Sequence, residues 1–440
     1  MPRVRGINYE DPPVKYRGQR VLSLARKLMG ENDIPRDLDE EFAASVYYAF
    51  FLPYPIIDKG AADNERELLK LSLLKTMVSS KKFIEARRST LADSVSSMVA
   101  AAVMVHAIAK ILSQQSGGVD SNDAGSLGNE DAQQREEKLK DYVDKALEEV
   151  KEIAESTHEI TSLASKFSAG NASMLNLDDS VDEVIKLAKN SDVRMILEAL
   201  KTIENLDSKI AVRKKPSSRG ELDGYEIGSD LERVVPTELA LPEELFVAKF
   251  AERQLLLYRK VVKEDYGPFY VLLDKSGSMM GMKSLWAKAV TIALARRAVK
   301  EGREFYIRFF DSIPYPPFYF SKRVHGRDIV KMLEYLARVR ANGGTDITRA
   351  IITAAEDIIS RSRGRRPSDI VLITDGEDRV ATEMIRRSLS RAKARLHTVM
   401  INGNNPDLRA VSERYLVTTK LDGAEALRVV DIAFSVGGSD

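Results

Sequence analysis

Apolar side chains recur every three to four positions over most of the first half of the chain. This spacing places them on one face of a helix, so each such segment is predicted to be amphipathic and to pack in a helical bundle. Gly30 ends the first helix, and Pro53 and Pro55 end the second. The predicted helices cover residues 16–29, 40–51, 64–79, 83–113 as one helix or two, 181–189 and 191–205.

A long charged segment interrupts this series. Residues 131–166 carry an apolar seam within many charged positions and predict one long helix. It is interpreted either as half of an antiparallel coiled hairpin or as a solvated helix with one face on the bundle. The preceding residues, about 116–130, are rich in Gly, Ser, Asp and Asn and predict a flexible loop. Residues 1–13 contain three prolines and predict an extended arm. All of this favours a helical domain over residues 1–206.

The segment 207–266 is predicted to be a linker with a connecting helix. Its first part, Arg213 to Gly220, is basic and rich in residues that break helices, which is typical of a loop, with a phosphate or nucleic-acid contact as the alternative. Its second part, Glu243 to Lys260, predicts the helix.

From residue 267 onwards short apolar runs alternate with amphipathic segments. Strands that alternate with helices predict an α/β domain over 267–440, with a mainly parallel sheet and helices on both faces. The predicted strands are 269–274, 304–310, 318–320, 369–373, 396–401 and 414–418. The predicted helices are 284–300, 327–340, 347–360, 382–394 and 424–434.

The first of these strands leads directly into a polar motif. Asp274 ends the apolar run, and Ser276 and Ser278 follow it on either side of Gly277. Glycine lets the backbone turn tightly enough for the carboxylate and the two hydroxyls to converge. In a doubly wound sheet, ligands bind outside the carboxyl ends of the strands. The motif is therefore a candidate ligand site.

Two later segments could complete this site. Thr345 lies in a Gly-Gly-Thr-Asp sequence before a helix, and Asp375 follows the strand that begins at Asp369. Together the three loops offer only oxygen donors, which are the ligands of a hard cation such as Mg²⁺, with Mn²⁺ or Ca²⁺ as alternatives. The hydroxyls of Ser276, Ser278 and Thr345 are expected to contact the ion. Asp274 and Asp375 are expected to hold its waters.

Neighbouring polar residues receive simpler interpretations. Asp346 is interpreted as a helix cap, and Glu377 and Asp378 as a solvated loop at the rim. Lys275 would oppose metal binding unless its cation points away.

The three motifs, in this order, resemble the metal-ion-dependent adhesion site of von Willebrand factor A domains, and all five positions match. In that family an Asp or Glu of a partner protein takes the open coordination position. The resemblance therefore implies a protein-binding module with bound metal.

A segment ahead of this domain narrows the resemblance. Asp230 to Ala240 reads Asp-Leu-Glu-Arg-Val-Val-Pro-Thr-Glu-Leu-Ala and resembles the ViaA/CoxE-like group. That group combines a helical N-terminal region with a C-terminal A domain. The resemblance implies an adaptor or cofactor of a MoxR-type AAA+ ATPase, acting in the remodelling or maturation of target complexes.

Composition excludes several other functions. The chain of 440 residues has no cysteine and four scattered histidines, so a disulfide framework or a zinc site is not expected. It has no Gly-x-x-x-x-Gly-Lys-Ser/Thr loop, so ATP hydrolysis is expected in a partner chain. Ser276 as a nucleophile would need a histidine base, and neither His325 nor His397 is expected near it. An enzyme is therefore not expected.

Location and charge complete the sequence-based expectations. The N-terminus lacks the apolar region of a secretory signal, and the longest apolar run, Met98 to Ala109, is too short for a bilayer, which favours a cytoplasmic protein without membrane insertion. The net charge is +1 in total, but residues 269–440 carry roughly +9 and the remainder roughly −8. The alternatives are a chelatase-type subunit with an AAA+ partner, and a nucleic-acid-binding protein that uses its basic half.

Overall fold

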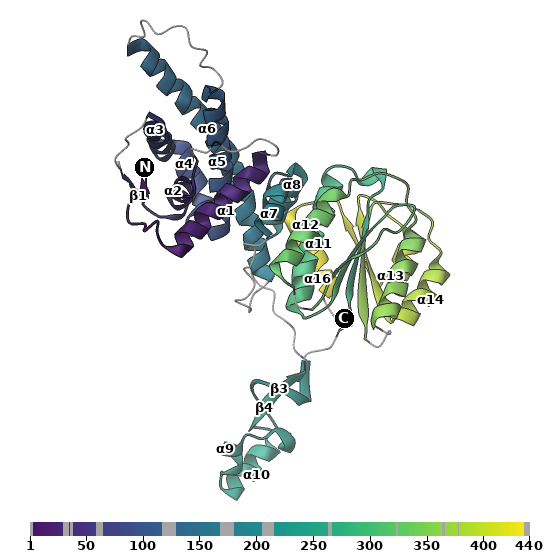
Figure 1. The fold of residues 1–440 in the computed structure, drawn as a ribbon. Helices are drawn as coiled ribbons and strands as arrows, with labels where there is room; N and C mark the ends of the chain where they lie inside the picture. Colours follow the sequence, from purple (N-terminus) through teal and green to yellow (C-terminus); the bar gives the residue numbers. More distant parts are fainter. Residues whose placement is uncertain are drawn as a thin grey trace. The chain divides into compact units, whose positions relative to one another are not determined.

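The computed structural model describes residues 3–29, 35, 38–58, 65–116, 129–167, 180–204, 215–262, 266–322, 324–362, 366–376 and 378–434. Two compact units make up the chain. Figure 1 shows the helices and strands of both in sequence colours. The first comprises Met1–Lys201 and Arg323–Arg340, and the second comprises Thr202–Lys322 and Ala341–Asp440. The loop predicted over about 116–130 lies almost entirely outside the described residues.

The first unit is helical, as the apolar periodicity predicts. Two helices form where one or two were expected over 83–113, and the predicted N-terminal arm instead contains a short strand and enters its helix at Pro12. The helices are α1 (Pro12–Met29), α2 (Glu40–Phe51), α3 (Glu65–Ser79), α4 (Lys81–Thr90), α5 (Ser94–Ser116), α6 (Asn129–Phe167), α7 (Val181–Ala188), α8 (Ser191–Glu204) and α12 (Gly326–Arg338). Strands β1 (Arg3–Val4) and β2 (Ile57–Asp58) pair antiparallel.

Helix α5 is the most apolar element of this unit. Its segment Ser94–Ser113, longer than the apolar run noted in the sequence, is long and apolar enough to cross a membrane by length and composition, and 83% of that window is buried inside the protein. The core helix of a soluble protein passes the same test.

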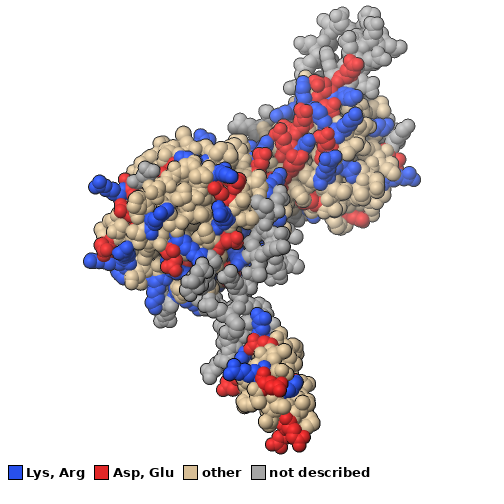
Figure 2. Space-filling view, turned by 180° about the vertical axis from the view of Figure 1, so that it is seen from behind, with Lys and Arg blue, Asp and Glu red and all other residues tan. Residues whose placement is uncertain are grey.

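The long charged helix α6 buries the predicted seam. Its apolar side chains, including Val143, Leu147 and Val150, are fully buried in the bundle. Its acidic side chains pair with basic residues of neighbouring helices, as in Lys82–Glu148 at 2.5 Å and Arg194–Glu152 at 2.7 Å. Acidic and basic side chains are interspersed on the face shown in Figure 2. The packing is that of a solvated helix with one face on a bundle.

The predicted connecting helix over Glu243–Lys260 is wrong beyond its first half. Helix α10 (Glu243–Ala251) ends before Arg253, which has a positive φ of 56°. The chain then forms β4 (Leu255–Val262), which pairs antiparallel with β3 (Lys215–Gly228), so the expected linker contains a two-stranded sheet. Between these strands lie η3 (Leu231–Arg233), α9 (Pro236–Leu239) and α10.

Burial explains this correction. Leu255 and Leu257 are buried beside Val234, and the partly buried Phe246 packs against them. Three consecutive leucines fit either a helical or an alternating pattern, so packing decides between the two.

A six-stranded sheet forms the centre of the C-terminal α/β domain, as predicted. The strand order is β10-β9-β8-β5-β6-β7, and all neighbouring pairs are parallel except β6 with β7. The strands are β5 (Phe269–Asp274), β6 (Phe305–Phe310), β7 (Phe318–Phe320), β8 (Ser368–Thr374), β9 (Ala394–Ile401) and β10 (Arg414–Thr418). The helices of this domain in the second unit are α11 (Met282–Lys300), α13 (Ile347–Ser362), α14 (Thr382–Ala392), α15 (Pro406–Val411) and α16 (Gly423–Phe434), with the short η4 (Gly277–Met279).

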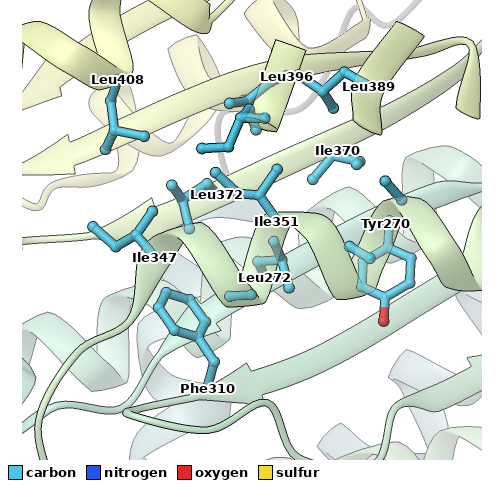
Figure 3. Close-up of a cluster of buried hydrophobic side chains, with 14 of the residues drawn as sticks. Tyr270, Leu272, Phe310, Ile347, Ile351, Ile370, Leu372, Leu389, Leu396 and Leu408 are labelled. Carbon is cyan, nitrogen blue, oxygen red and sulfur yellow. The ribbon is translucent and has the colours of Figure 1, made fainter. Parts of the chain in front are cut away.

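Alternate residues of β5 pack against helices on opposite faces of the sheet. Tyr270 and Leu272 lie in a buried cluster with residues of α13 and α14, including Ile351 and Leu389 (Figure 3). On the other face, the Phe269 ring stacks on Phe434 of α16 with 4.5 Å between the ring centroids. Burial on both faces explains why the strand is a continuous apolar run.

A buried ionic cluster lies at the end of the sheet where the parallel strands begin. Asp369 Oδ2 accepts a bond from Arg303 at 2.7 Å, and its Oδ1 contacts Arg395 at 2.8 Å and His397 at 3.2 Å. Burial alone would raise the pKa of Asp369, but the bond from His397 and the two guanidinium charges lower it to about 2. The ionised carboxylate therefore stabilises the fold.

The Asp369 contribution should depend on pH. Because its pKa falls from 3.8 to about 2 on folding, its stabilisation of about 2 kcal/mol is fully present above about pH 4 and is lost towards pH 2. Asp369→Asn leaves Arg303 buried without its partner and should cost about 3–5 kcal/mol at neutral pH. The fluorescence of Trp286, the single tryptophan, reports unfolding in urea. The difference between wild type and variant should shrink as the pH falls; a constant difference would contradict this account.

Candidate metal centre

The topology of the sheet brings two of the three polar loops together. After β5 the chain forms β6 on one side, and it later returns to form β8 on the other side of β5. This reversal is a topological switch point, which is where ligands bind in open α/β sheets. Asp274 ends β5, and Asp375 follows Thr374 at the end of β8.

Asp274 is a buried carboxylate at the bottom of the site. Its Oδ1 accepts the backbone N–H of Ser276 at 2.7 Å, and its Oδ2 accepts the hydroxyl of Thr374. Burial raises the pKa of Asp274, the hydrogen bonds from Thr374 and Ser276 lower it, and the nearby charge of Asp375 raises it again, with a raised pKa as the result. A cation at the site would offset this cost of burying a charge.

A chain of hydrogen bonds connects the remaining residues of the first and third motifs. The hydroxyls of Ser276 and Ser278 lie 3.1 Å apart, and the Ser278 hydroxyl donates to Asp375 Oδ1 at 2.7 Å. Two hydroxyls are thus held between two carboxylates.

The loop that carries Thr345 is attached to the first motif by backbone hydrogen bonds. The N–H of Asn342 donates to the carbonyl of Lys275 at 2.7 Å, and the N–H of Gly277 donates to the carbonyl of Gly343 at 3.1 Å. The methyl carbon of Thr345 lies 3.3 Å from the place a Cβ on Gly376 would take. The structure therefore brings all three predicted loops together.

Residues around the site behave mostly as the sequence indicates. Asp346 caps α13, because its carboxylate accepts the N–H of Arg349 at 2.9 Å, which confirms its structural role. Asp378 is exposed, and Glu377 lies outside the described residues. As expected, His397 lies towards the other end of the parallel strands, and its imidazole contacts Asp369 there.

Two lysines lie beside the motifs, and only one of them contacts a predicted site residue. Lys275 Nζ pairs with Asp311 Oδ2 at 2.8 Å, so its charge is held by another carboxylate. Lys283 Nζ lies 2.6 Å from Asp375 Oδ2. Lys283 and Thr374 contact predicted site residues without having been predicted themselves, although Thr374 directly precedes Asp375 in the third motif.

The donor set suits a hard cation. It consists of two carboxylates and three hydroxyls. A different kind of metal site, built from three or more His, Cys, Asp or Glu side chains, does not occur in the described part of the chain. Hydroxyl and carboxylate oxygens suit Mg²⁺ or Mn²⁺, whereas Zn²⁺ favours the thiolates and imidazoles that are missing here. The residues fit the predicted ion, and metal binding by them stays a prediction.

Comparison with known proteins supports the fold of this domain. Residues 269–415 match the family described as von Willebrand factor type A domain. The uncharacterized protein MJ0811 of Methanocaldococcus jannaschii is 27% identical over 316 residues, which cover 67% of this chain and 69% of that protein.

Two solved structures are similar to part of this chain. BatB from Bacteroides thetaiotaomicron is 15% identical with a TM-score of 0.30, over 38% of this chain and 96% of that one. The von Willebrand factor type A protein from Catenulispora acidiphila is 18% identical with a TM-score of 0.31, over 40% of this chain and 43% of that one. The C-terminal part of the chain is a von Willebrand factor type A domain.

Gly343 should be essential for the shape of the Thr345 loop. Its φ is 109°, and a Cβ there would lie 3.0 Å from Asp311 Oδ2. Gly343→Ala should therefore lower the free energy of unfolding by about 1–3 kcal/mol and weaken Mg²⁺ binding. Urea unfolding and calorimetric Mg²⁺ titration measure the two effects.

Gly302→Ala is the matched control. Gly302 also has a positive φ, of 69°, but a Cβ there meets no atom within 4 Å. The control should lose some stability and keep its Mg²⁺ affinity. Equal Mg²⁺ affinity in both variants would show that the conformation of Gly343 does not affect metal binding.

Proposed function

We propose that this protein binds Mg²⁺ between Asp274, Ser276, Ser278, Thr345 and Asp375, and uses the ion to bind a carboxylate of a partner protein. The observation that carries the proposal is the hydrogen-bonded series from Asp274 through the two serines to Asp375, at the switch point of the sheet. Mn²⁺ or Ca²⁺ could replace Mg²⁺ in such an oxygen site.

The expected roles follow from charge. The three hydroxyls are neutral ligands, and the two carboxylates orient them and hold water. An ion with few negative ligands keeps most of its charge and attracts an Asp or Glu from outside. Bound in this way, the ion supplies a strong electrostatic contact to that carboxylate.

The proposed partner is a MoxR-type AAA+ ATPase, with this chain as its adaptor in remodelling or maturation of a target complex. Support comes from the resemblance of Asp230 to Ala240 to the ViaA/CoxE-like group. In the structure this segment forms η3 and α9, and Arg233 within it pairs with Glu226 and Asp230. The proposal assigns no catalytic step to this chain, and a cytoplasmic location is part of it.

Mg²⁺ should stabilise the C-terminal domain. A ligand that binds only the folded state at about 100 times its Kd adds about 2.7 kcal/mol to the free energy of unfolding. Asp274→Ala should remove this gain, whereas Asp378→Ala, an exposed aspartate at the rim, should keep it. Urea unfolding with Mg²⁺ and with EDTA, followed by Trp286 fluorescence, measures the difference. Equal unfolding with and without Mg²⁺ in the wild type would refute the metal site.

Capture of the ATPase should depend on the metal. A MoxR-type ATPase from the source organism should be retained by immobilised wild type in Mg²⁺, and lost in EDTA or with Asp274→Ala. Capture that is indifferent to both would move the ATPase contact away from the metal. Salt-sensitive binding of DNA that survives EDTA would favour the nucleic-acid alternative. An AAA+ partner from a porphyrin pathway would favour the chelatase alternative.

A further inference from the structure

Lys283 lies in the first turn of a helix, a position that is unfavourable for a cation. It is the second residue of α11, whose first turn contains no acidic residue. The N-terminus of a helix carries a partial positive charge, so a lysine there is unfavourable. Its ammonium lies 2.6 Å from Asp375 Oδ2. The favourable partner at the candidate site offsets the unfavourable helix position.

This contact occupies the carboxylate that the metal would use. Asp375 Oδ1 accepts the Ser278 hydroxyl and Oδ2 accepts Lys283, so each oxygen has a partner. The Asp375 side chain is 3% exposed, whereas that of Lys283 is 29% exposed. Lys283 thus reaches from the rim of the site to its buried carboxylate, and its charge competes with that of an ion there.

The other lysine of the site is not available for this role. The Lys275 side chain is 13% exposed, its ammonium is bound to Asp311, and it lies 4.6 Å from the centroid of the Tyr315 ring. Of these two lysines, Lys283 is therefore the one that a partner approaching the rim would meet.

The rim around Lys283 is apolar and adaptable. Met280 and Met282 are 69% and 67% exposed, and Gly281 lies between them with a φ of 76°. Methionine is unbranched and polarizable, and it is common on surfaces that accept varied partners. A carboxylate with apolar neighbours would match this combination of charge and methionine.

We propose that Lys283 is a second cation of the site, which holds Asp375 when the metal is absent and pairs with the partner's carboxylate when the metal is bound. The inference rests on the proposed function and deepens it. The partner segment is then an Asp or Glu flanked by apolar residues, whose carboxylate would pair with Lys283 as well as with the bound ion.

Metal affinity tests the first half of the inference. Lys283→Met removes the competing charge at similar length, and should tighten Mg²⁺ binding by about three- to tenfold. Lys283→Arg keeps the charge and should stay within about twofold of wild type. Lys300→Met is the matched control, because it makes the same change at the other end of α11, about 25 Å away, and should leave the affinity unchanged.

Peptide binding tests the second half. The probe is acetyl-Leu-Asp-Leu-amide with saturating Mg²⁺, and its Asn counterpart is the control ligand. Wild type should bind the Asp peptide more tightly than the Asn peptide. Lys283→Met should bind the Asp peptide about three- to tenfold more weakly, although it binds Mg²⁺ more tightly. These opposite changes distinguish the proposal from a general loss of structure.

The outcomes separate the two proposals. Absence of Mg²⁺ binding by the wild type would refute the proposed function itself. Mg²⁺ binding that needs Asp274, with Lys283→Met equal to wild type for Mg²⁺, would refute the inference alone. Tighter Mg²⁺ binding with unchanged peptide binding would also overturn it, because Lys283 would then only compete with the metal.

Discussion

The pairing of β5 between β6 and β8 is the constraint on which the candidate site depends. It fixes the ends of β5 and β8 side by side, although about 100 residues of sequence separate them. Once that register is set, the Thr374 hydroxyl reaches Asp274, and Ser278 reaches Asp375. The apolar faces of β5 secure the register, because Tyr270 and Phe269 pack on opposite sides of the sheet.

Charged residues are held differently at the two ends of the parallel strands. At the end where the strands begin, Asp369 is surrounded by Arg303, Arg395 and His397, so its charge is compensated by the protein. At the other end, Asp274 is held by hydrogen bonds and lies near another carboxylate, and burial raises its pKa. One end therefore contributes to stability, whereas the other buries a carboxylate at a cost in free energy. A buried carboxylate with a raised pKa is typical of a functional site.

The sequence predicted the sheet and the loops well because both are governed by local pattern. A strand buried on both faces is a continuous apolar run, and the polar residues after Asp274 and Thr374 follow at fixed short distances. The second half of the helix predicted over Glu243–Lys260 was wrong because three consecutive leucines fit two periods, and the burial of Leu255 and Leu257 with Val234 and Phe246 selects the strand. The sequence also could not predict that α12 belongs to the N-terminal unit, because this depends on contacts between distant parts of the chain.

Lys283 shows which part of a site a sequence motif leaves out. In the sequence it stands just before the helix predicted over 284–300, and a lysine in such a position is normally solvated. Its role depends on Gly281, the N-cap of α11, which has a positive φ. From this start of the helix the Lys283 ammonium reaches Asp375. The motif thus predicts the oxygen donors, which lie within a few residues of strand ends. The charges that tune those donors come from the next element along the chain, and only their geometry reveals them.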